Sequence, residues 1–335
     1  MSSSTAGASR STQIRASAPG KLMLAGEYVV ALRGAPALAV AVDRRLTVAV
    51  TPESRKSWLV TSPGLGLKDA PLKSVPVLAE VVARLPGIPG GGRIRVTSEL
   101  GEGPQKPGLG GSAALCAAAF VARWKASGAS GPPDREIAIA AHRAAQGGRG
   151  SGYDVAAALT GGVTLFHPGQ NGSQSRVEPL SWPEGLWGGV FRTGRGANTT
   201  ELLGRVQAWQ LEDAESYEAC IEPLAIETEA FTRAFMSGDV RAILDAAAQV
   251  QEELAALDRI GELGILGGGQ CQLLGAIEDS GAIGRTAGAG GGDCAWALTD
   301  DPETLPRVES ACAEMGFARL ELKLGGHGAR LGEDE

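Results

Sequence analysis

A glycine turn that runs directly into a helix constrains this chain more than any other stretch of its sequence. Residues 106–112 read Lys-Pro-Gly-Leu-Gly-Gly-Ser, and the alanine-rich segment from Ala113 to about Ser127 predicts the helix. Glycines permit positive φ and let the backbone approach a ligand closely. The first N–H groups of a helix have no partner within it, and the helix dipole attracts negative charge. This entrance therefore predicts a site for a nucleotide phosphate.

The polar side chains of the turn are consistent with that prediction but do not prove it. Lys106 places a cation just before the glycines, and Ser112 can either cap the helix or offer its hydroxyl to Mg²⁺. An ordinary capped loop is the alternative that this stretch alone leaves open.

Composition limits the class of protein. A chain of 335 residues with 43% hydrophobic residues predicts two sub-domains around a shared cleft. A net charge of −7 and an aromatic content of 4% argue against binding to nucleic acid or to an anionic membrane. Five scattered cysteines with no CxxC pair indicate a reduced, cytoplasmic protein without a zinc site. No apolar run is long enough for a membrane span.

Strands and helices are mixed along the chain, which predicts an α+β fold. We expect a flexible leader at 1–12, an N-terminal domain at 13–175 and a C-terminal domain at 176–330, separated by the polar turn Gly169–Ser175. The pattern predicts two strands, Ala37–Val42 and Leu46–Val50, joined by a turn at Asp43-Arg44. It also predicts a strand at Ala318–Leu324 and a mobile acidic tail.

Three further segments pair flexible backbone with a functional side chain. They are Lys21 after Pro19-Gly20, the run Gly150–Asp154, and the glycine-dense turn Gly288–Asp293. Asp154 is a candidate to orient or deprotonate a hydroxyl beside a lysine cation. A surface lysine, a helix cap and a tight hairpin are the structural alternatives for the three. The usual P-loop, dinucleotide, zinc-hydrolase and serine-esterase motifs are absent from the sequence.

Taken together, these segments resemble the three motifs of the GHMP kinase superfamily. Ala18–Tyr28 is similar to the first motif, Gly108–Ala114 to the second and Gly288–Asp293 to the third. Within the superfamily the chain is most similar to the phosphomevalonate kinase family. That similarity is carried by Ala25–Tyr28, where mevalonate kinases usually have a His after the Glu, and by four further segments: Lys106–Leu109, His142–Gly147 with Gly150–Ala157, Thr193–Arg195 with Thr199–Leu202, and Gly288–Cys294.

The resemblance implies a GHMP kinase fold, with an N-terminal domain like ribosomal protein S5 domain 2 and a C-terminal ferredoxin-like α/β sandwich. It implies transfer of the γ-phosphoryl group of ATP to 5-phosphomevalonate, with Mg²⁺ placed by Ser112, and it allows a homodimer. Lys21 and Asp154 would be catalytic. The residues expected to bind ATP are Lys106, Gly108, Leu109, Gly110, Gly111, Ser112 and Ala113. The residues expected at the substrate are Lys21, Glu27, Tyr28, Arg149, Ser151, Gly152, Arg195, Gly290 and Gly291.

The chain also departs from the pattern of the superfamily. Gly111 replaces the first serine of the usual Ser-Ser pair, and Arg143 stands where mevalonate kinases have a Mg²⁺-binding Glu. Arg285 and Ala287 replace the Lys and Ser that commonly precede the third motif. The full set of metal ligands therefore stays open. The alternatives are a kinase that acts on mevalonate or a sugar alcohol, and a catalytically silent GHMP-fold regulator that binds a ligand. The presence of Lys21 and Asp154 speaks against the silent regulator.

Overall fold

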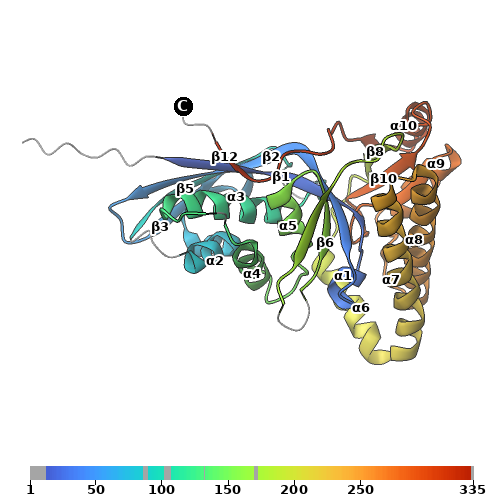
Figure 1. The fold of residues 1–335 in the computed structure, drawn as a ribbon, viewed down its shortest axis with the longest axis horizontal. Coiled ribbons are helices and arrows are strands. Elements are labelled where there is room, and N and C mark those ends of the chain that lie inside the picture. The colour runs from blue at the N-terminus through green and yellow to red at the C-terminus, as the bar shows by residue number, and fades with distance from the viewer. Residues whose placement is uncertain (1–12, 86–89, 102–106, 132, 170–172, 333–335) are drawn as a thin grey trace, which may run out of the picture.

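The computed structural model describes residues 13–85, 90–101, 107–131, 133–169 and 173–332. The chain forms two β-sheets with helices packed against them, which confirms the α+β class (Figure 1). The predicted leader at 1–12, the acidic tail at 333–335 and Lys106 lie outside the described residues. Of the helices within the described ranges, none has the length and apolar character that a bilayer span would need.

The first sheet has eight strands, in the order β12-β1-β2-β5-β3-β4, with β6 and β7 branching from β2. Pairing is antiparallel except between β3 and β5. The strands are β1 (Ile14–Ala25), β2 (Ala37–Glu53), β3 (Trp58–Ser62), β4 (Leu67–Pro71), β5 (Gly91–Ser98), β6 (Val163–His167), β7 (Arg176–Leu180) and β12 (Arg330–Leu331).

Helices α2 (Pro76–Arg84), α3 (Gly111–Ala126), α4 (Arg135–Ala145) and α5 (Tyr153–Thr160) lie on one face of this sheet (Figure 1). Helix α3 packs directly on β1 and β2. Its alanines are buried on nearly every side, and small side chains let a helix approach a sheet closely. Asp134 caps α4, since its carboxylate accepts a hydrogen bond from the N–H of Glu136.

The second sheet is antiparallel, in the order β11-β8-β10-β9. Its strands are β8 (Trp187–Arg192), β9 (Ile283–Thr286), β10 (Cys294–Thr299) and β11 (Ala318–Arg319). Alternate residues of a strand face opposite sides of the sheet. Accordingly Trp296 joins the main core, whereas Ala295 and Ala297 join a smaller core with helices α9 (Gln270–Asp279) and α10 (Thr304–Glu314).

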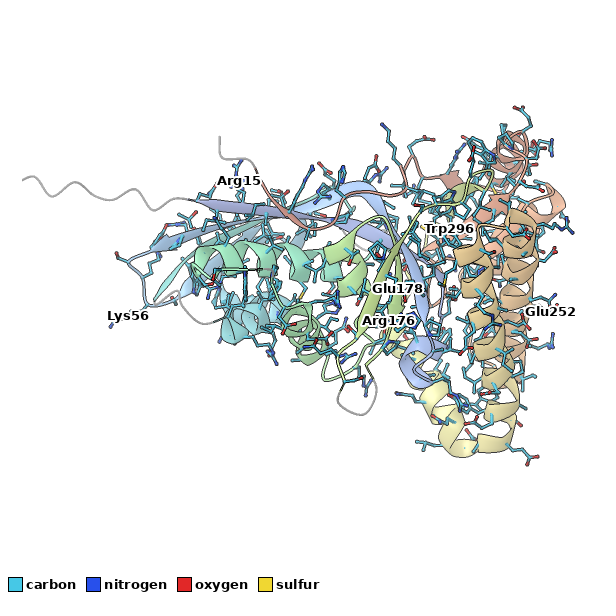
Figure 2. The ribbon with its side chains drawn as sticks, viewed as in Figure 1. Arg15, Lys56, Arg176, Glu178, Glu252 and Trp296 are labelled. Atoms are coloured by element: carbon cyan, nitrogen blue, oxygen red, sulfur yellow. The ribbon has the colours of Figure 1, made fainter. Side chains whose placement is uncertain are left out.

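The remaining helices are α1 (Val29–Leu32), α6 (Thr199–Glu212), α7 (Ala214–Ser237) and α8 (Val240–Gly261). The last two form a long hairpin beside the second sheet (Figure 1). The main core continues from the first sheet into this hairpin, and Trp296 lies at the junction (Figure 2). Its indole N–H donates to the carbonyl of Met23 over 2.7 Å, which ties β10 to β1.

Two predictions about strands are wrong. Residues 37–53 form one strand, β2, and Asp43-Arg44 is not a turn, because β1 pairs along most of the strand and β6 and β5 pair with its two ends. The last predicted strand is only Ala318–Arg319, since the chain then leaves the second sheet and returns to the first. There the N–H of Lys323 donates to the side chain of Asp43 and the N–H of Gly325 to the carbonyl of Ala41.

The division into domains at residue 175 stays a prediction. Strand β7 lies beyond that residue yet pairs with β6, and β12 pairs with β1, so both belong to the first sheet. Strands β6 and β7 are therefore neighbours in one sheet, and residues 170–172 of the predicted polar turn between them lie outside the described residues.

A fully buried ion pair joins the segment that follows β1 of the first sheet to β9 of the second sheet, just before the third glycine motif in the sequence. Arg285 of β9 donates to a carboxylate oxygen of Glu27 over 2.7 Å, and both side chains are 0% exposed. The same guanidinium donates to the carbonyl of Ala247 on α8 at 3.5 Å. Neither side chain is in contact with solvent, so each charge is stabilised by the other and not by water.

We predict that Arg285→Ala destabilises the protein by about 3–5 kcal/mol, because it leaves a buried carboxylate without its partner. The double variant Glu27→Gln/Arg285→Met should lose less, since it leaves no charge behind. Urea unfolding followed by circular dichroism measures both changes.

The exposed pair between Arg241 and Asp245 is the matched control. Asp245→Ala should cost less than about 1 kcal/mol, because solvent screens that pair. An Arg285→Ala variant as stable as Asp245→Ala would contradict a stabilising role for the buried pair.

Candidate active site

A cleft of about 320 Å³ lies where segments far apart in the sequence meet. Strand β1, the glycine turn before α3, the loop into α5 and the loop before β10 all contribute residues to its wall. The predicted site residues that line it are Lys21, Glu27, Tyr28, Gly108, Leu109, Gly110, Gly111, Ser112, Ala113, Arg149, Ser151 and Asp154. Three of the four segments chosen from the sequence therefore open onto one cavity, and the fourth touches it through Ala289 and Asp293.

The glycine turn presents an uncapped helix end to the cleft. Gly108 and Gly110 have φ of 66° and 72°, in the left-handed region that favours glycine. Gly110 is the N-cap of α3 and has no side chain to accept from the first N–H groups. Ser112 therefore does not cap the helix, which was one of the two roles open to it. An uncapped helix end offers its N–H groups and its dipole to an anion.

The turn is held against Lys21 of β1. The backbone N–H of Lys21 donates to the carbonyl of Leu109 over 2.9 Å. A Cβ added to Gly110 would lie 2.8 Å from Cε of Lys21, so glycine is the residue that allows this approach. The contact fixes an ammonium group beside the open end of the helix.

Lys21 keeps its positive charge although it is buried. Burial by itself lowers its pKa, but interactions with Tyr153 and with the carboxylates of Asp154 and Asp293 outweigh that effect. Its pKa is therefore raised above the ordinary value of 10.5. Nζ donates a hydrogen bond to the hydroxyl oxygen of Tyr153 over 2.9 Å. Burial in turn raises the pKa of Tyr153, which stays a neutral phenol.

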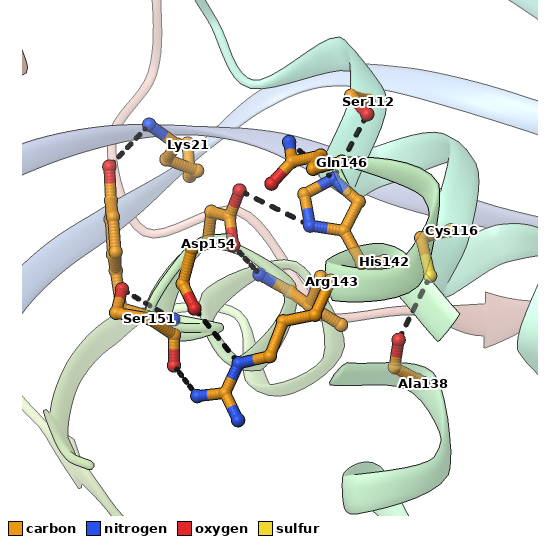
Figure 3. Close-up of polar contacts among 12 residues, drawn as sticks. Lys21, Ser112, Cys116, Ala138, His142, Arg143, Gln146, Ser151 and Asp154 are labelled. Carbon is orange, nitrogen blue, oxygen red and sulfur yellow. Dashed lines mark hydrogen bonds and ion pairs between the residues drawn. The ribbon is translucent and has the colours of Figure 1, made fainter. Parts of the chain in front are cut away.

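Asp154 stands in the first turn of α5 and is connected to Ser112 through an imidazole (Figure 3). One carboxylate oxygen accepts from the N–H of Val155 over 2.9 Å. The other lies 3.7 Å from Nδ1 of His142, and Nε2 of that ring lies 2.9 Å from the hydroxyl oxygen of Ser112. The buried ring of His142 therefore lies between Ser112 of the glycine turn and the carboxylate of Asp154, with one ring nitrogen facing each.

Arg143, which replaces the Mg²⁺-binding Glu of mevalonate kinases, has a structural role here. Its Nε donates to the carbonyl of Gly150 over 2.9 Å, and its Nη2 donates to the carbonyl of Ser151 (Figure 3). The guanidinium thus fixes the loop that leads into Asp154.

The loop before β10 closes the cleft from the second sheet. The hydroxyl of Tyr28 donates to the carbonyl of Ala289, and the thiol of Cys294 donates to the carbonyl of Pro107 over 3.1 Å. A Cβ on Gly108 would collide with the carboxylate of Asp293. Glycine at 108 is therefore required where the second and third motifs touch.

Several predicted substrate residues do not line this cleft or are engaged in other contacts. Arg195 does not line the cleft, and its carbonyl accepts from the N–H of Asp293. Gly152 caps α5 and Gly291 packs against Leu202, whereas Gly290 lines a smaller cavity that shares Lys21 and Gly108 with the cleft. Glu27 reaches the cleft, but its carboxylate is committed to Arg285. The substrate roles of these residues stay predictions, as does the role of Lys106.

Sequence reasoning missed Tyr153, His142, Gln146 and Arg285 as partners of the site. His142 and Gln146 are four residues apart on α4, which places both on one helical face, and that spacing was a usable signal. No local pattern pairs Tyr153 with Lys21 or Arg285 with Glu27.

The described residues contain no group of three or more His, Cys, Asp or Glu side chains that could hold a metal ion. Mg²⁺ commonly keeps several waters and takes only one or two oxygens from the protein beside substrate phosphates. The hydroxyl of Ser112 and the carboxylates of Asp154 and Asp293 face the cleft. This donor set fits a cation that arrives with a polyphosphate.

Comparison with known proteins agrees with this geometry. The family model described as GHMP kinases N terminal domain matches residues 74–162. A phosphomevalonate kinase of Streptomyces sp. (strain CL190) is 29% identical, covering 84% of this chain and 89% of the relative. A mevalonate kinase of Aeropyrum pernix is 30% identical, covering 95% of this chain and 98% of the relative.

A solved structure of similar shape is the Streptococcus pneumoniae phosphomevalonate kinase in complex with phosphomevalonate and AMPPNP. It has a TM-score of 0.79 and 18% identity, and the match covers 93% of this chain and 99% of that one. This likeness confirms the GHMP kinase fold predicted from the three motifs. With a relative 30% identical along almost its whole length, the chain belongs to the GHMP kinase superfamily and is a phosphotransferase.

Proposed function

We propose that this protein transfers the γ-phosphoryl group of ATP to 5-phosphomevalonate and so forms 5-diphosphomevalonate. The observation that carries the proposal is the meeting of Lys21, Asp154 and the uncapped N-terminus of α3 at one cleft. Support for this acceptor comes from the four segments that resemble phosphomevalonate kinases and from the Streptomyces relative of that name.

The nucleotide would bind with its phosphates at Gly108–Ala113. The N–H groups of this turn and the dipole of α3 would neutralise part of the phosphate charge. Ser112 would give its hydroxyl oxygen to Mg²⁺, which when bound shields the charge that develops on the transferred group. Lys106, next to this turn in the sequence, is proposed to add a further cation.

Lys21 and Asp154 would act on the acceptor. In the transfer, an oxygen of the acceptor phosphate bonds to the γ-phosphorus, and the bond to the β–γ bridging oxygen breaks to release ADP. The Lys21 ammonium would bring the two negatively charged groups together and stabilise the attacking oxygen. Since that oxygen is already ionised, Asp154 would mainly hold the acceptor and Lys21 in position rather than remove a proton.

Arg149 is the better candidate of the two predicted arginines for the anionic end of the acceptor, because it lines the cleft and Arg195 does not. A guanidinium can bind a carboxylate or phosphate through two parallel hydrogen bonds.

Mevalonate is the second candidate acceptor, because the Aeropyrum pernix relative, which covers 95% of this chain, is a mevalonate kinase. The acceptor there is a hydroxyl, for which Asp154 would have to take a proton.

The choice of acceptor is tested by measuring ADP release with 5-phosphomevalonate, mevalonate and galactose in turn. We expect kcat/KM to be at least about 100-fold higher for 5-phosphomevalonate, because mevalonate lacks the phosphate that the site would bind and galactose carries no charge at all. Turnover of mevalonate alone would refute the proposed acceptor, and turnover of none of the three would favour a silent ligand-binding protein.

Asp154→Ala should lower kcat by at least about 100-fold, a loss of roughly 3 kcal/mol of barrier stabilisation, with the fold intact. Asp154→Asn keeps the shape of the side chain and tests whether its charge matters. Asp245→Asn on the exposed face of α8 is the control for loss of a carboxylate. An unchanged kcat in Asp154→Ala would remove this residue from the mechanism.

The raised pKa of Lys21 makes a prediction about pH. A lysine with a raised pKa is charged below its ordinary value of 10.5 and loses its proton only above it. Deprotonation of Lys21 should therefore not limit kcat between about pH 7 and pH 10. Lys21→Arg, whose guanidinium does not titrate in this range, should show an alkaline limb of the same shape as the wild type, whatever its absolute rate. An alkaline decline that disappears in Lys21→Arg would mean that the pKa of Lys21 is lowered.

A further inference from the structure

His142 is a buried polar residue that the proposed chemistry does not use. It lies on α4 and is 2% exposed. It stands between Ser112, which is assigned to the nucleotide, and Asp154, which is assigned to the acceptor (Figure 3). Nδ1 faces the carboxylate of Asp154 at 3.7 Å, and Nε2 faces the hydroxyl of Ser112 at 2.9 Å. The amide nitrogen of Gln146 lies 3.5 Å from the same Nε2.

If the imidazole of His142 is neutral, its neighbours favour one position for the proton. The carboxylate of Asp154 is too far from Nδ1 for a direct hydrogen bond, but its negative charge favours the hydrogen on the nitrogen that faces it. The amide nitrogen of Gln146, at 3.5 Å, can only donate and favours a lone pair on Nε2. Both contacts select the tautomer with the proton on Nδ1 and a lone pair on Nε2.

The tautomer fixes the direction of the Ser112 hydroxyl. With a lone pair on Nε2, Ser112 must donate its hydrogen to the ring, and the free lone pairs of its oxygen then point away from His142. Ser112 is itself exposed at the cleft. A cation binds to oxygen lone pairs and is repelled by a hydroxyl hydrogen, so this orientation suits a metal ligand.

We propose that His142 is a positioning residue that orients Ser112 toward the cation and phosphates and Asp154 toward the acceptor. It touches neither ligand and acts through its two neighbours, as the outer partners of metal and substrate ligands do. The proposal rests on the proposed function for its kinetic readout but not for the tautomer, which is a property of the free protein.

The first test is the ¹⁵N NMR spectrum of the histidine rings in the unliganded protein. The sequence has three histidines, so single replacement of the other two assigns the signal of His142. We expect the pattern of a neutral ring protonated on Nδ1, and we expect Asp154→Asn to shift its Nδ1 signal. A ring protonated on Nε2 would overturn the proposal.

The second test separates the two arms with two substitutions. The amide of His142→Asn reaches the place of Nδ1, so it keeps the contact with Asp154 and loses the contact with Ser112. The amide of His142→Gln reaches the place of Nε2 and does the reverse. We expect His142→Asn mainly to raise the KM for Mg·ATP, by about tenfold or more, and His142→Gln mainly to lower kcat, by about tenfold or more.

His167 supplies the control, because it lies on β6 beside Arg176 and Glu178, away from the residues that line the cleft. His167→Gln should leave both kcat and KM unchanged. If His142 only filled the core, both of its variants would lower stability and alter kcat and KM alike, and that result would refute the proposal. Thermal unfolding of each variant is measured alongside the kinetics.

The acceptor assay and the kinetics of the His142 variants together separate failure of this inference from failure of the proposed function. If the protein uses another acceptor, the proposed substrate is wrong, and the split between the two His142 variants is measured with that acceptor. If 5-phosphomevalonate is turned over and the variants show no split, the function stands and the role of His142 falls.

Discussion

The open end of α3 against β1 is the contact on which the site depends. One backbone hydrogen bond, from the N–H of Lys21 to the carbonyl of Leu109, sets the position of the glycine turn. The turn has no side chain that could fill its anion site, and the cation beside it belongs to another element. A helix of small residues packs at close range on a sheet. The dipole of α3 and the ammonium of Lys21 therefore act on the same part of the cleft.

The buried charges of Lys21, Glu27 and Arg285 are stabilised by defined partners. Lys21 lies among Tyr153, Asp154 and Asp293, which hold its pKa high although burial alone would lower it. Glu27 and Arg285 neutralise each other where the two parts of the molecule meet. Arg285, which replaces the lysine that commonly precedes the third motif, has a role in this pair, since its guanidinium donates to Glu27 and to α8.

The sequence predicted the helix after the glycine turn because its run of small residues is a local pattern. The predicted helix from Ala113 to about Ser127 corresponds to α3 within two residues. The sequence failed for β2 and β11. A charged dipeptide such as Asp43-Arg44 is typical of a turn, but here it lies at a register shift within the pairing of β1 and β2. Strands β6 and β5 pair with the two ends of β2, and no local pattern reports those partners.

The sequence by itself determined the superfamily, the glycine turns and the identity of Lys21, Ser112 and Asp154, because chemistry that needs a particular residue type leaves a local motif. Only the tertiary structure decided how they are connected. The link from Ser112 through His142 to Asp154 spans three helices, and the contact between Lys21 and Tyr153 spans 132 residues. Such contacts depend on the packing of helices on a sheet, and packing is a property of distant residues brought together, which no single stretch of sequence contains.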